Sequence, residues 1–238
     1  TDCTVLWDFS EAGAKLQLYF HRNGGKYVIQ IMDVKKSFGA EEVLHGITRE
    51  FEPGKIHGIV GNNGSGKTVL MKCICGFLRP TSGRILVDGK EVGKDMDFPE
   101  NLGAIIETPG FLPNLTGLKN LKLLASLRGK IGEEQIRSSL RRVGLDPDLK
   151  KTVSKYSLGM RQRLGIAQAI MEDPSLLILD EPFNGLDKTG VAQMRHLIQD
   201  LQSEGKTILL ASHNQADIDI LCDTVCEMDA GHMQIVTG

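Results

Sequence analysis

Hydrophobic positions along this chain follow two different patterns, and each pattern predicts a different kind of element. Continuous apolar runs, typical of buried strands, occur at Lys55–Val60, at Leu176–Asp180 and in TILLASH, which ends at His213. Helical spacing appears in LTGLKNLKLLASL, EEQIRSSLRRVGL and SLGMRQRLGIAQAIM, all within residues 108–172. The pattern therefore predicts an α/β core that is interrupted by a helical subdomain at about residues 108–172.

The segments around this insertion support a largely parallel sheet. Residues 27–60 are rich in strand pattern, and RILVDGKEV reads as a hairpin on Asp88-Gly89. After the insertion come an apolar strand, a helix at about Lys188–Ser203, a second strand and a final hairpin through Ala230-Gly231. Because strands and helices alternate, we expect a mostly parallel sheet with an antiparallel β subdomain beside it.

The first 26 residues do not fit this plan clearly. Lys15–Phe20 alternates like a strand, and HRNGGK is a plausible turn into a strand that starts at Tyr27. The segment is a hairpin of this kind, an unrelated appended sequence or a poorly ordered arm, and the residues do not decide between them. We therefore divide the chain into an N-terminal segment, 1–26, and one domain, 27–238.

Composition narrows the class of protein. The chain has 238 residues, of which 41% are hydrophobic and 24% charged, as in ordinary globular proteins. A net charge of −2 provides no basic field for nucleic acid or anionic lipid. No apolar run approaches the roughly 20 residues that cross a bilayer, and no signal pattern argues for secretion. Five cysteines without framework spacing suit reduced thiols, so we expect a cytoplasmic protein whose membrane role, if any, requires a partner.

The strongest chemical signal is GNNGSGKT, from Gly61 to Thr68, which fits G-x-x-x-x-G-K-[ST] between a buried strand and a helical run. Glycines let backbone N–H groups point at a phosphate, and the helix start adds its positive dipole end. Lys67 supplies charge for the β- and γ-phosphates, and the Thr68 hydroxyl can ligate Mg²⁺. The loop predicts nucleoside triphosphate binding. Its predicted contacts are Gly61, Asn62, Asn63, Gly64, Ser65, Gly66, Lys67, Thr68 and Val69.

Three further residues stand where apolar strands end. A P-loop enzyme needs a carboxylate such as Asp180 to hold the Mg²⁺ shell opposite Thr68. Glu181 follows at once and could polarise the attacking water. His213 is expected at the crevice edge where ligands bind in open α/β sheets.

These residues resemble, in the same order, the motifs of the ATP-binding subunits of ABC transporters, from about Tyr27 to the C-terminus. GNNGSGKT resembles the Walker A loop, LLILDEP the Walker B strand, and NGLD, ending at Asp187, the D-loop. His213 is similar to the switch histidine that contacts the γ-phosphate. Tyr156–Arg163, YSLGMRQR, is similar to the LSGGQ signature, which separates this family from other P-loop enzymes.

The resemblance implies a P-loop NTPase fold that uses ATP and Mg²⁺. ATP would join the chain to a second copy of itself or to a homologous ATPase subunit, and hydrolysis would release them. The motion would pass to a separate integral membrane permease near the apolar tip at Phe111 and Leu112, which places the chain at the cytoplasmic face of the membrane. Phe38 stands where the family has an aromatic residue that stacks on adenine.

Two departures from the family pattern concern the site itself. In the signature, Ser157 and Gly159 match the family, whereas Tyr156, Leu158 and Met160 do not. Leu158 could restrict the approach of the partner's nucleotide. The residues expected to contact the ATP held by the partner subunit are Ser157, Leu158, Gly159 and Met160.

The second departure is Glu107, which occupies the position of the glutamine in the family's Q-loop. A glutamate keeps the oxygen ligand and adds a negative charge beside the triphosphate. That charge should strengthen metal binding and disfavour phosphate when metal is absent. We therefore expect Thr68, Glu107 and Asp180 to be the metal ligands. An acidic Q-loop with a YSLGM signature resembles the subfamily that exports, or gives immunity to, antibiotics and lantibiotic-like peptides.

Two alternatives compete with the transport ATPase. A soluble ABC ATPase acting on DNA or ribosomes would need a long coiled coil or two nucleotide domains, and this chain has room for neither. A nucleotide-regulated adaptor would not need Asp180, Glu181 and His213 together. The transported substrate, the direction of transport and the identity of the permease do not follow from the sequence.

Overall fold

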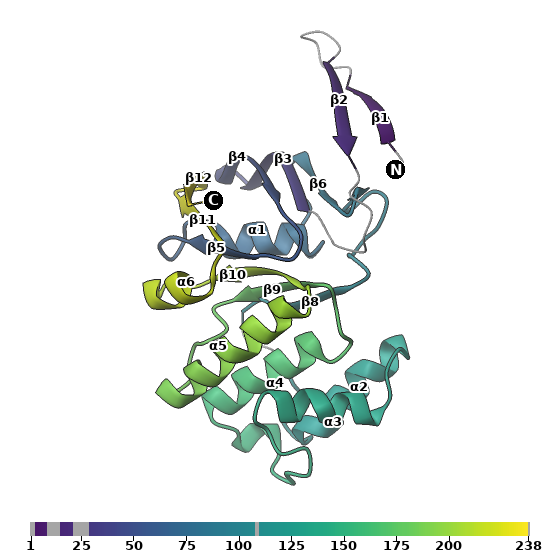
Figure 1. Ribbon diagram of the computed structural model, residues 1–238, viewed down its shortest axis with the longest axis vertical. Helices are drawn as coiled ribbons and strands as arrows, with labels where there is room; N and C mark the ends of the chain where they lie inside the picture. Colours follow the sequence, from purple (N-terminus) through teal and green to yellow (C-terminus); the bar gives the residue numbers. More distant parts are fainter. Residues whose placement is uncertain (1–2, 9–14, 21–28, 108–109, 238) are drawn as a thin grey trace.

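The computed structural model describes residues 3–8, 15–20, 29–107 and 110–237. Its centre is a six-stranded sheet in the order β12-β11-β5-β10-β9-β8, in which β11, β5, β10, β9 and β8 are parallel and β12 is antiparallel (Figure 1). The strands are β5 Ile56–Val60, β8 Leu102–Ile105, β9 Leu176–Asp180, β10 Thr207–Ala211, β11 Thr224–Asp229 and β12 His232–Thr237.

A second sheet confirms the expected antiparallel subdomain. It has four strands in the order β4-β3-β6-β7. Its strands are β3 Ile29–Phe38, β4 Glu41–Phe51, β6 Ser82–Val87 and β7 Lys90–Glu91. The hairpin predicted on Asp88-Gly89 joins β6 to β7, with left-handed φ values of 51° and 75° that suit this turn.

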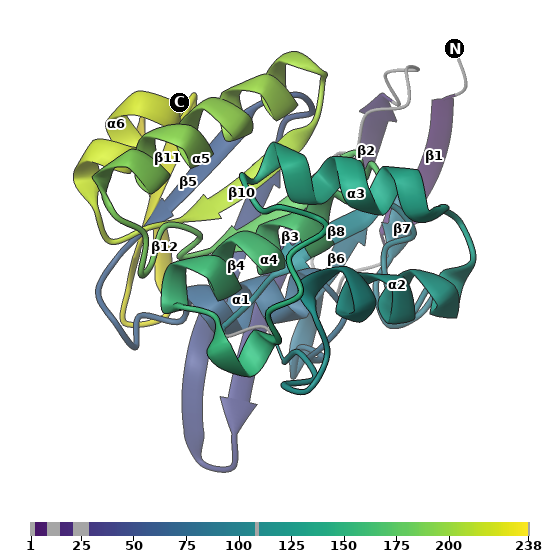
Figure 2. The same cartoon turned by 90° about the horizontal axis from the view of Figure 1, so that it is seen from below.

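Helices cover the two faces of the six-stranded sheet. Helix α1, Lys67–Ile74, lies between the two sheets, whereas α4 and α5 cover the opposite face (Figure 1). In Figure 2, α4 lies between α5 on one side and α2 and α3 on the other. The remaining elements are α2 Gly117–Arg128, α3 Glu133–Arg142, the 3₁₀ helix η1 Val153–Lys155, α4 Leu158–Ile170, α5 Lys188–Ser203 and α6 Gln215–Leu221.

The position of strand β9 between two cores explains why its first four residues are apolar. Leu177 and Leu179 pack into the core beneath the helices, whereas Leu176 and Ile178 pack into the core shared with α1 and the antiparallel sheet. All five residues of β9 are buried, including Asp180 at its end. The strand therefore holds its terminal carboxylate at a fixed point on the sheet edge.

The N-terminal segment contains a strand, but its partner differs from that of the hairpin we considered, which was one of three alternatives that the sequence left open. Lys15–Phe20 forms β2 and pairs antiparallel with β1, Cys3–Asp8, in a separate two-stranded sheet. Residues 21–28, which include the predicted turn, lie outside the described residues, and the division at residue 26 stays a prediction. Within the described part of the chain, no helix is long and apolar enough to cross a bilayer.

Candidate functional site

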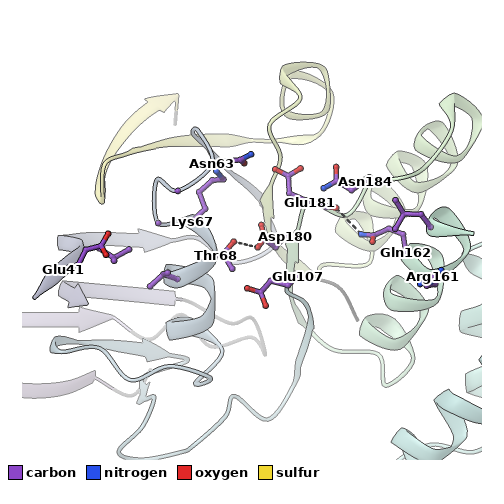
Figure 3. A pocket seen from close by; sticks show the side chains of 15 residues that line it. Glu41, Asn63, Lys67, Thr68, Glu107, Arg161, Gln162, Asp180, Glu181 and Asn184 are labelled. Atoms are coloured by element: carbon purple, nitrogen blue, oxygen red, sulfur yellow. Dashed lines mark hydrogen bonds between the residues drawn. The ribbon is translucent and has the colours of Figure 1, made fainter. Parts of the chain in front are cut away.

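The phosphate loop leaves β5 and enters α1, so its strand–loop–helix context is as predicted. Gly66 caps α1 at φ 101°, a conformation that glycine adopts without strain. Gly61 also has no room for a side chain, because a Cβ there would lie 2.1 Å from the main-chain oxygen of Met228. The loop borders a cleft of about 560 Å³ that faces α4 (Figure 3).

Lys67 is turned onto its own loop. Its Nζ donates hydrogen bonds to the main-chain oxygens of Gly61, at 2.7 Å, and Asn62, at 2.9 Å. The side chain is buried but still lines the cleft. The hydrogen bonds of the ammonium are therefore made by the loop carbonyls, and the ammonium lies where it can exchange these carbonyls for a phosphate.

Thr68 and Asp180 are brought together from α1 and β9. The Thr68 hydroxyl donates to Asp180 Oδ2 at 2.6 Å (Figure 3). Burial raises the pKa of Asp180, and the Thr68 hydrogen bond and the charge of Lys67 offset part of that rise. A hydroxyl and one carboxylate suit Mg²⁺, which prefers hard oxygen ligands and usually takes the remainder from water and phosphate. Among the described residues no group of three or more His, Cys, Asp or Glu side chains is placed to hold a metal ion.

Glu107 lines the same cleft but pairs with a residue that the sequence did not indicate. Its Oε1 lies 2.6 Å from Nζ of Lys72 on α1. The backbone of Glu107 is left-handed at φ 62°, and its side chain is 62% exposed. The Glu107 carboxylate therefore has a partner already, Lys72, besides the metal site that the sequence predicted for it.

Glu181 and His213 form a second pair at the end of the sheet. Glu181 Oε2 lies 2.7 Å from Nδ1 of His213. The two residues follow β9 and β10, which are adjacent parallel strands, so their carboxyl ends meet at one edge. A carboxylate on an imidazole beside a phosphate loop can orient or deprotonate a water and hold a phosphate oxygen.

The signature residues begin α4 as expected. Ser157 caps the helix, and its hydroxyl accepts a hydrogen bond from the backbone N–H of Met160 at 3.2 Å. Leu158 is 58% exposed and lines the cleft. It also leans on the chain's own D-loop, since a Cβ on Gly185 would lie 2.4 Å from Leu158 Cγ. Gly159 faces the same loop, and its contact with a partner subunit stays a prediction.

Phe38 and Asp187 stand at element boundaries. Phe38 ends β3 with 48% of its surface exposed, and Nζ of Lys36 lies 5.0 Å from its ring centroid. The cleft is lined on this side by Glu41 and Val43, which sequence reasoning did not single out. Stacking of Phe38 on adenine stays a prediction. Asp187 caps α5 by accepting a hydrogen bond from Gly190 N–H at 2.8 Å.

Sequence reasoning also missed Gln162, which faces the loop across the cleft (Figure 3). Its buried side chain donates a hydrogen bond from Nε2 to the main-chain oxygen of Glu181 at 3.1 Å. The available signal was its place in YSLGMRQR, two residues after the core of the signature.

Comparisons with known proteins agree with this geometry. A profile of the family described as ABC transporter matches residues 44–184. The chain is 41% identical over 207 residues to the uncharacterized ABC transporter ATP-binding protein YybJ of Bacillus subtilis (strain 168), covering 87% of this chain and 95% of the relative. It is 42% identical over 210 residues to the bacitracin transport ATP-binding protein BcrA of Enterococcus faecalis, covering 87% and 68%. It is 38% identical over 198 residues to the lantibiotic transport ATP-binding protein SrtF of Streptococcus pyogenes, covering 83% and 85%.

Solved structures share the fold. The dimeric bacterial ABC transporter cassette MJ0796 superposes with a TM-score of 0.79 at 21% identity, covering 88% of this chain and 99% of that one. An ATP-binding subunit of an ABC transporter superposes with a TM-score of 0.78 at 27% identity, covering 88% and 90%.

Proposed function

The chain belongs to the ABC transporter family as an ATP-binding ATPase subunit, and we propose that it drives export of a peptide antibiotic through a separate membrane permease. The observation that carries this proposal is the convergence of four elements on one cleft: the Walker A loop, Asp180, Glu181 and Glu107 at the Q-loop position. His213 contacts this cleft through its bond to Glu181. The relatives named for bacitracin and lantibiotic transport support the substrate class.

The chain's own residues account for the chemistry. Lys67 exchanges its two loop carbonyls for oxygens of the β- and γ-phosphates, while the backbone N–H groups of the loop cradle the triphosphate. Glu181 orients or deprotonates the attacking water, and His213, bonded to Glu181, contacts the γ-phosphate. Mg²⁺, held by Thr68 and Asp180 with Glu107 nearby, would neutralise charge on the phosphate oxygens.

The active site is completed by a second subunit. Ser157, Leu158, Gly159 and Met160 would contact the ATP of the partner, because the N–H groups at the start of a helix lack main-chain partners and can turn to a phosphate. The solved relative MJ0796 is dimeric, which supports this arrangement. ATP then joins the two chains, and hydrolysis lets them part.

Replacing Glu181 by glutamine tests the proposal. The variant should bind ATP, accumulate as a dimer in size-exclusion chromatography with ATP, and lose steady-state phosphate release. Retained hydrolysis at the wild-type rate would show that another group activates the water. A wild-type chain that binds ATP without releasing phosphate would instead favour a nucleotide-regulated adaptor.

The permease is expected to dock near Phe111 and Leu112, which places the chain at the cytoplasmic face of the membrane. Leu112 is 49% exposed, whereas Phe111 is partly buried against the helical core. Asn120 holds this loop in place: its Oδ1 accepts from Leu112 N–H at 2.8 Å, and its Nδ2 donates to Leu112 O at 3.1 Å. A rigid loop that presents an apolar side chain suits a stable contact with a partner protein.

Co-purification with the cognate permease tests this surface. Phe111→Asp and Leu112→Asp should both lose the permease while they keep ATP binding. The second variant guards against a folding defect, because Leu112 is the more exposed of the two. Unchanged co-purification of both variants would reject the docking site.

A further inference from the structure

A buried amide joins the signature helix to the backbone of the water-activating residue. Gln162 lies in the second turn of α4, and only 8% of it is exposed. Its Nε2 donates to the main-chain oxygen of Glu181 at 3.1 Å, a contact visible in Figure 3. A buried amide group is costly to leave unpaired, so this bond is a fixed part of the fold.

Glu181 needs such support because its backbone is in an unfavourable conformation. Its φ is 51°, in the left-handed region that residues with a Cβ rarely adopt. Strained conformations of this kind persist only where the surroundings determine them fully. The direction of the Glu181 carboxylate therefore depends on what holds its peptide groups.

Three hydrogen bonds hold these peptide groups, and they come from different parts of the molecule. Glu181 N–H donates to Ala211 O at 2.9 Å on the neighbouring strand. Glu181 O accepts from Asn184 N–H at 3.3 Å within the local turn and from Gln162. Of these three donors and acceptors, only Gln162 belongs to the helical subdomain.

The same helix begins with the signature. Gln162 follows Ser157 by five residues, a rise of about 7.5 Å along α4. The first turn of α4 also presses on the loop after Glu181, because a Cβ on Gly159 would lie 2.8 Å from Gly185 O. A small rotation or translation of α4 against the sheet would therefore move the donor that holds Glu181 O.

We propose that Gln162 is a positioning residue for Glu181, so that the helix whose start serves the partner's ATP also sets the carboxylate that serves the chain's own ATP. The inference rests on the proposed function, in which Glu181 activates water and Ser157 faces the second subunit. Gln162 acts through the Glu181 backbone and takes no part in the chemistry itself. Its loss should lower the rate of hydrolysis and leave ATP binding intact.

The test replaces Gln162 by methionine, which is similar in size and apolar, and by glutamate, which keeps the shape but loses the amide donor. In both variants kcat for ATP hydrolysis should fall on the order of tenfold, since small misplacements of a catalytic group have effects of this size. KM and the affinity for a fluorescent ATP analogue should stay within about twofold, because the phosphate loop is untouched. Thermal unfolding of each variant with and without ATP establishes that the chain is folded.

The matched control is Gln168→Met, a half-buried glutamine on the same helix whose loss should leave kcat unchanged. The decisive comparison repeats Gln162→Met in a Glu181→Gln background and measures slow single-turnover phosphate release. There Gln162→Met should add no more than about twofold, because a positioning residue has no effect once its target is disabled.

An equal fall in both backgrounds would overturn the inference, and so would an unchanged kcat or a loss confined to ATP binding. A wild-type chain without hydrolysis would contradict the proposed function instead, so the two failures are distinguishable.

Discussion

Replacing Lys72 by methionine should increase the affinity of the nucleotide site for Mg²⁺. In the structure Lys72 Nζ holds Glu107 Oε1 at 2.6 Å. A metal ion that recruits Glu107 competes with Lys72 for the charge of this carboxylate. Methionine keeps the stem that packs along α1 and removes the charge that competes with the metal.

The exposure of the pair sets the size of the effect. The Glu107 side chain is 62% exposed and that of Lys72 27%, so solvent screens most of their attraction. Ion pairs of this kind contribute about 0.2–1 kcal/mol, which corresponds to a gain in Mg²⁺ affinity of at most about fivefold. The gain should shrink as salt is added, because screening already weakens the pair in the wild type.

The assay is a Mg²⁺ titration of fluorescent ATP analogue binding at low ionic strength, which reports the metal without relying on turnover. Lys94→Met makes the same change of net charge at a lysine outside the cleft and should leave the titration unchanged. In a Glu107→Gln background, Lys72→Met should have lost its effect. Weaker Mg²⁺ binding in Lys72→Met, or an equal gain in the Glu107→Gln background, would refute the competition between Lys72 and the metal.

Three other predictions follow from single positions. In denaturant titrations, Gly185→Ala should lower the free energy of unfolding by about 1–3 kcal/mol more than Gly205→Ala. Both glycines have a left-handed φ, but only at Gly185 would the new Cβ lie 2.4 Å from Leu158 Cγ. Equal losses of stability in the two variants would contradict this packing. Asp180→Asn should raise the melting temperature of the nucleotide-free protein at pH 7 while abolishing hydrolysis. Burial raises the pKa of Asp180, so its ionisation opposes folding as pH rises through that pKa; the gain should therefore vanish on acidification below the unfolded pKa of 3.8, and a gain that persists there would contradict this cause. Phe38→Ala should weaken ATP binding by about 1 kcal/mol, and Phe38→Tyr should not. If Phe38→Ala and the wild type bound ATP with equal affinity in an equilibrium binding assay, stacking of Phe38 on adenine would be rejected.

The parts of the site that sequence could predict are those fixed by local order. The phosphate loop, Asp180 and His213 were predicted to lie together because each stands at or just after the end of an apolar strand, and parallel strands bring their ends to one edge. The helix predicted at Lys188–Ser203 and the turn at Asp88-Gly89 were also confirmed, since their signals lie within a few residues.

What the sequence could not indicate are pairings between distant side chains. Lys72 and Glu107 are 35 residues apart, and nothing in either local pattern points to the other. The bond from Gln162 to Glu181 depends on how α4 packs against the sheet, which periodicity does not specify. The pairing of β1 with β2 was missed because residues 3–8 gave no recognised strand pattern.

The resting position of Lys67 has a consequence for which nucleotides can enter. Its two hydrogen bonds to Gly61 O and Asn62 O must break before the ammonium can bind a phosphate, at a cost of about 1 kcal/mol each. A monophosphate reaches the loop without the distal oxygens that would compensate this lysine, whereas a di- or triphosphate supplies them. The loop should thus discriminate by the length of the phosphate tail before any partner arrives, and AMP should remain a poor competitor even at concentrations where ADP displaces ATP.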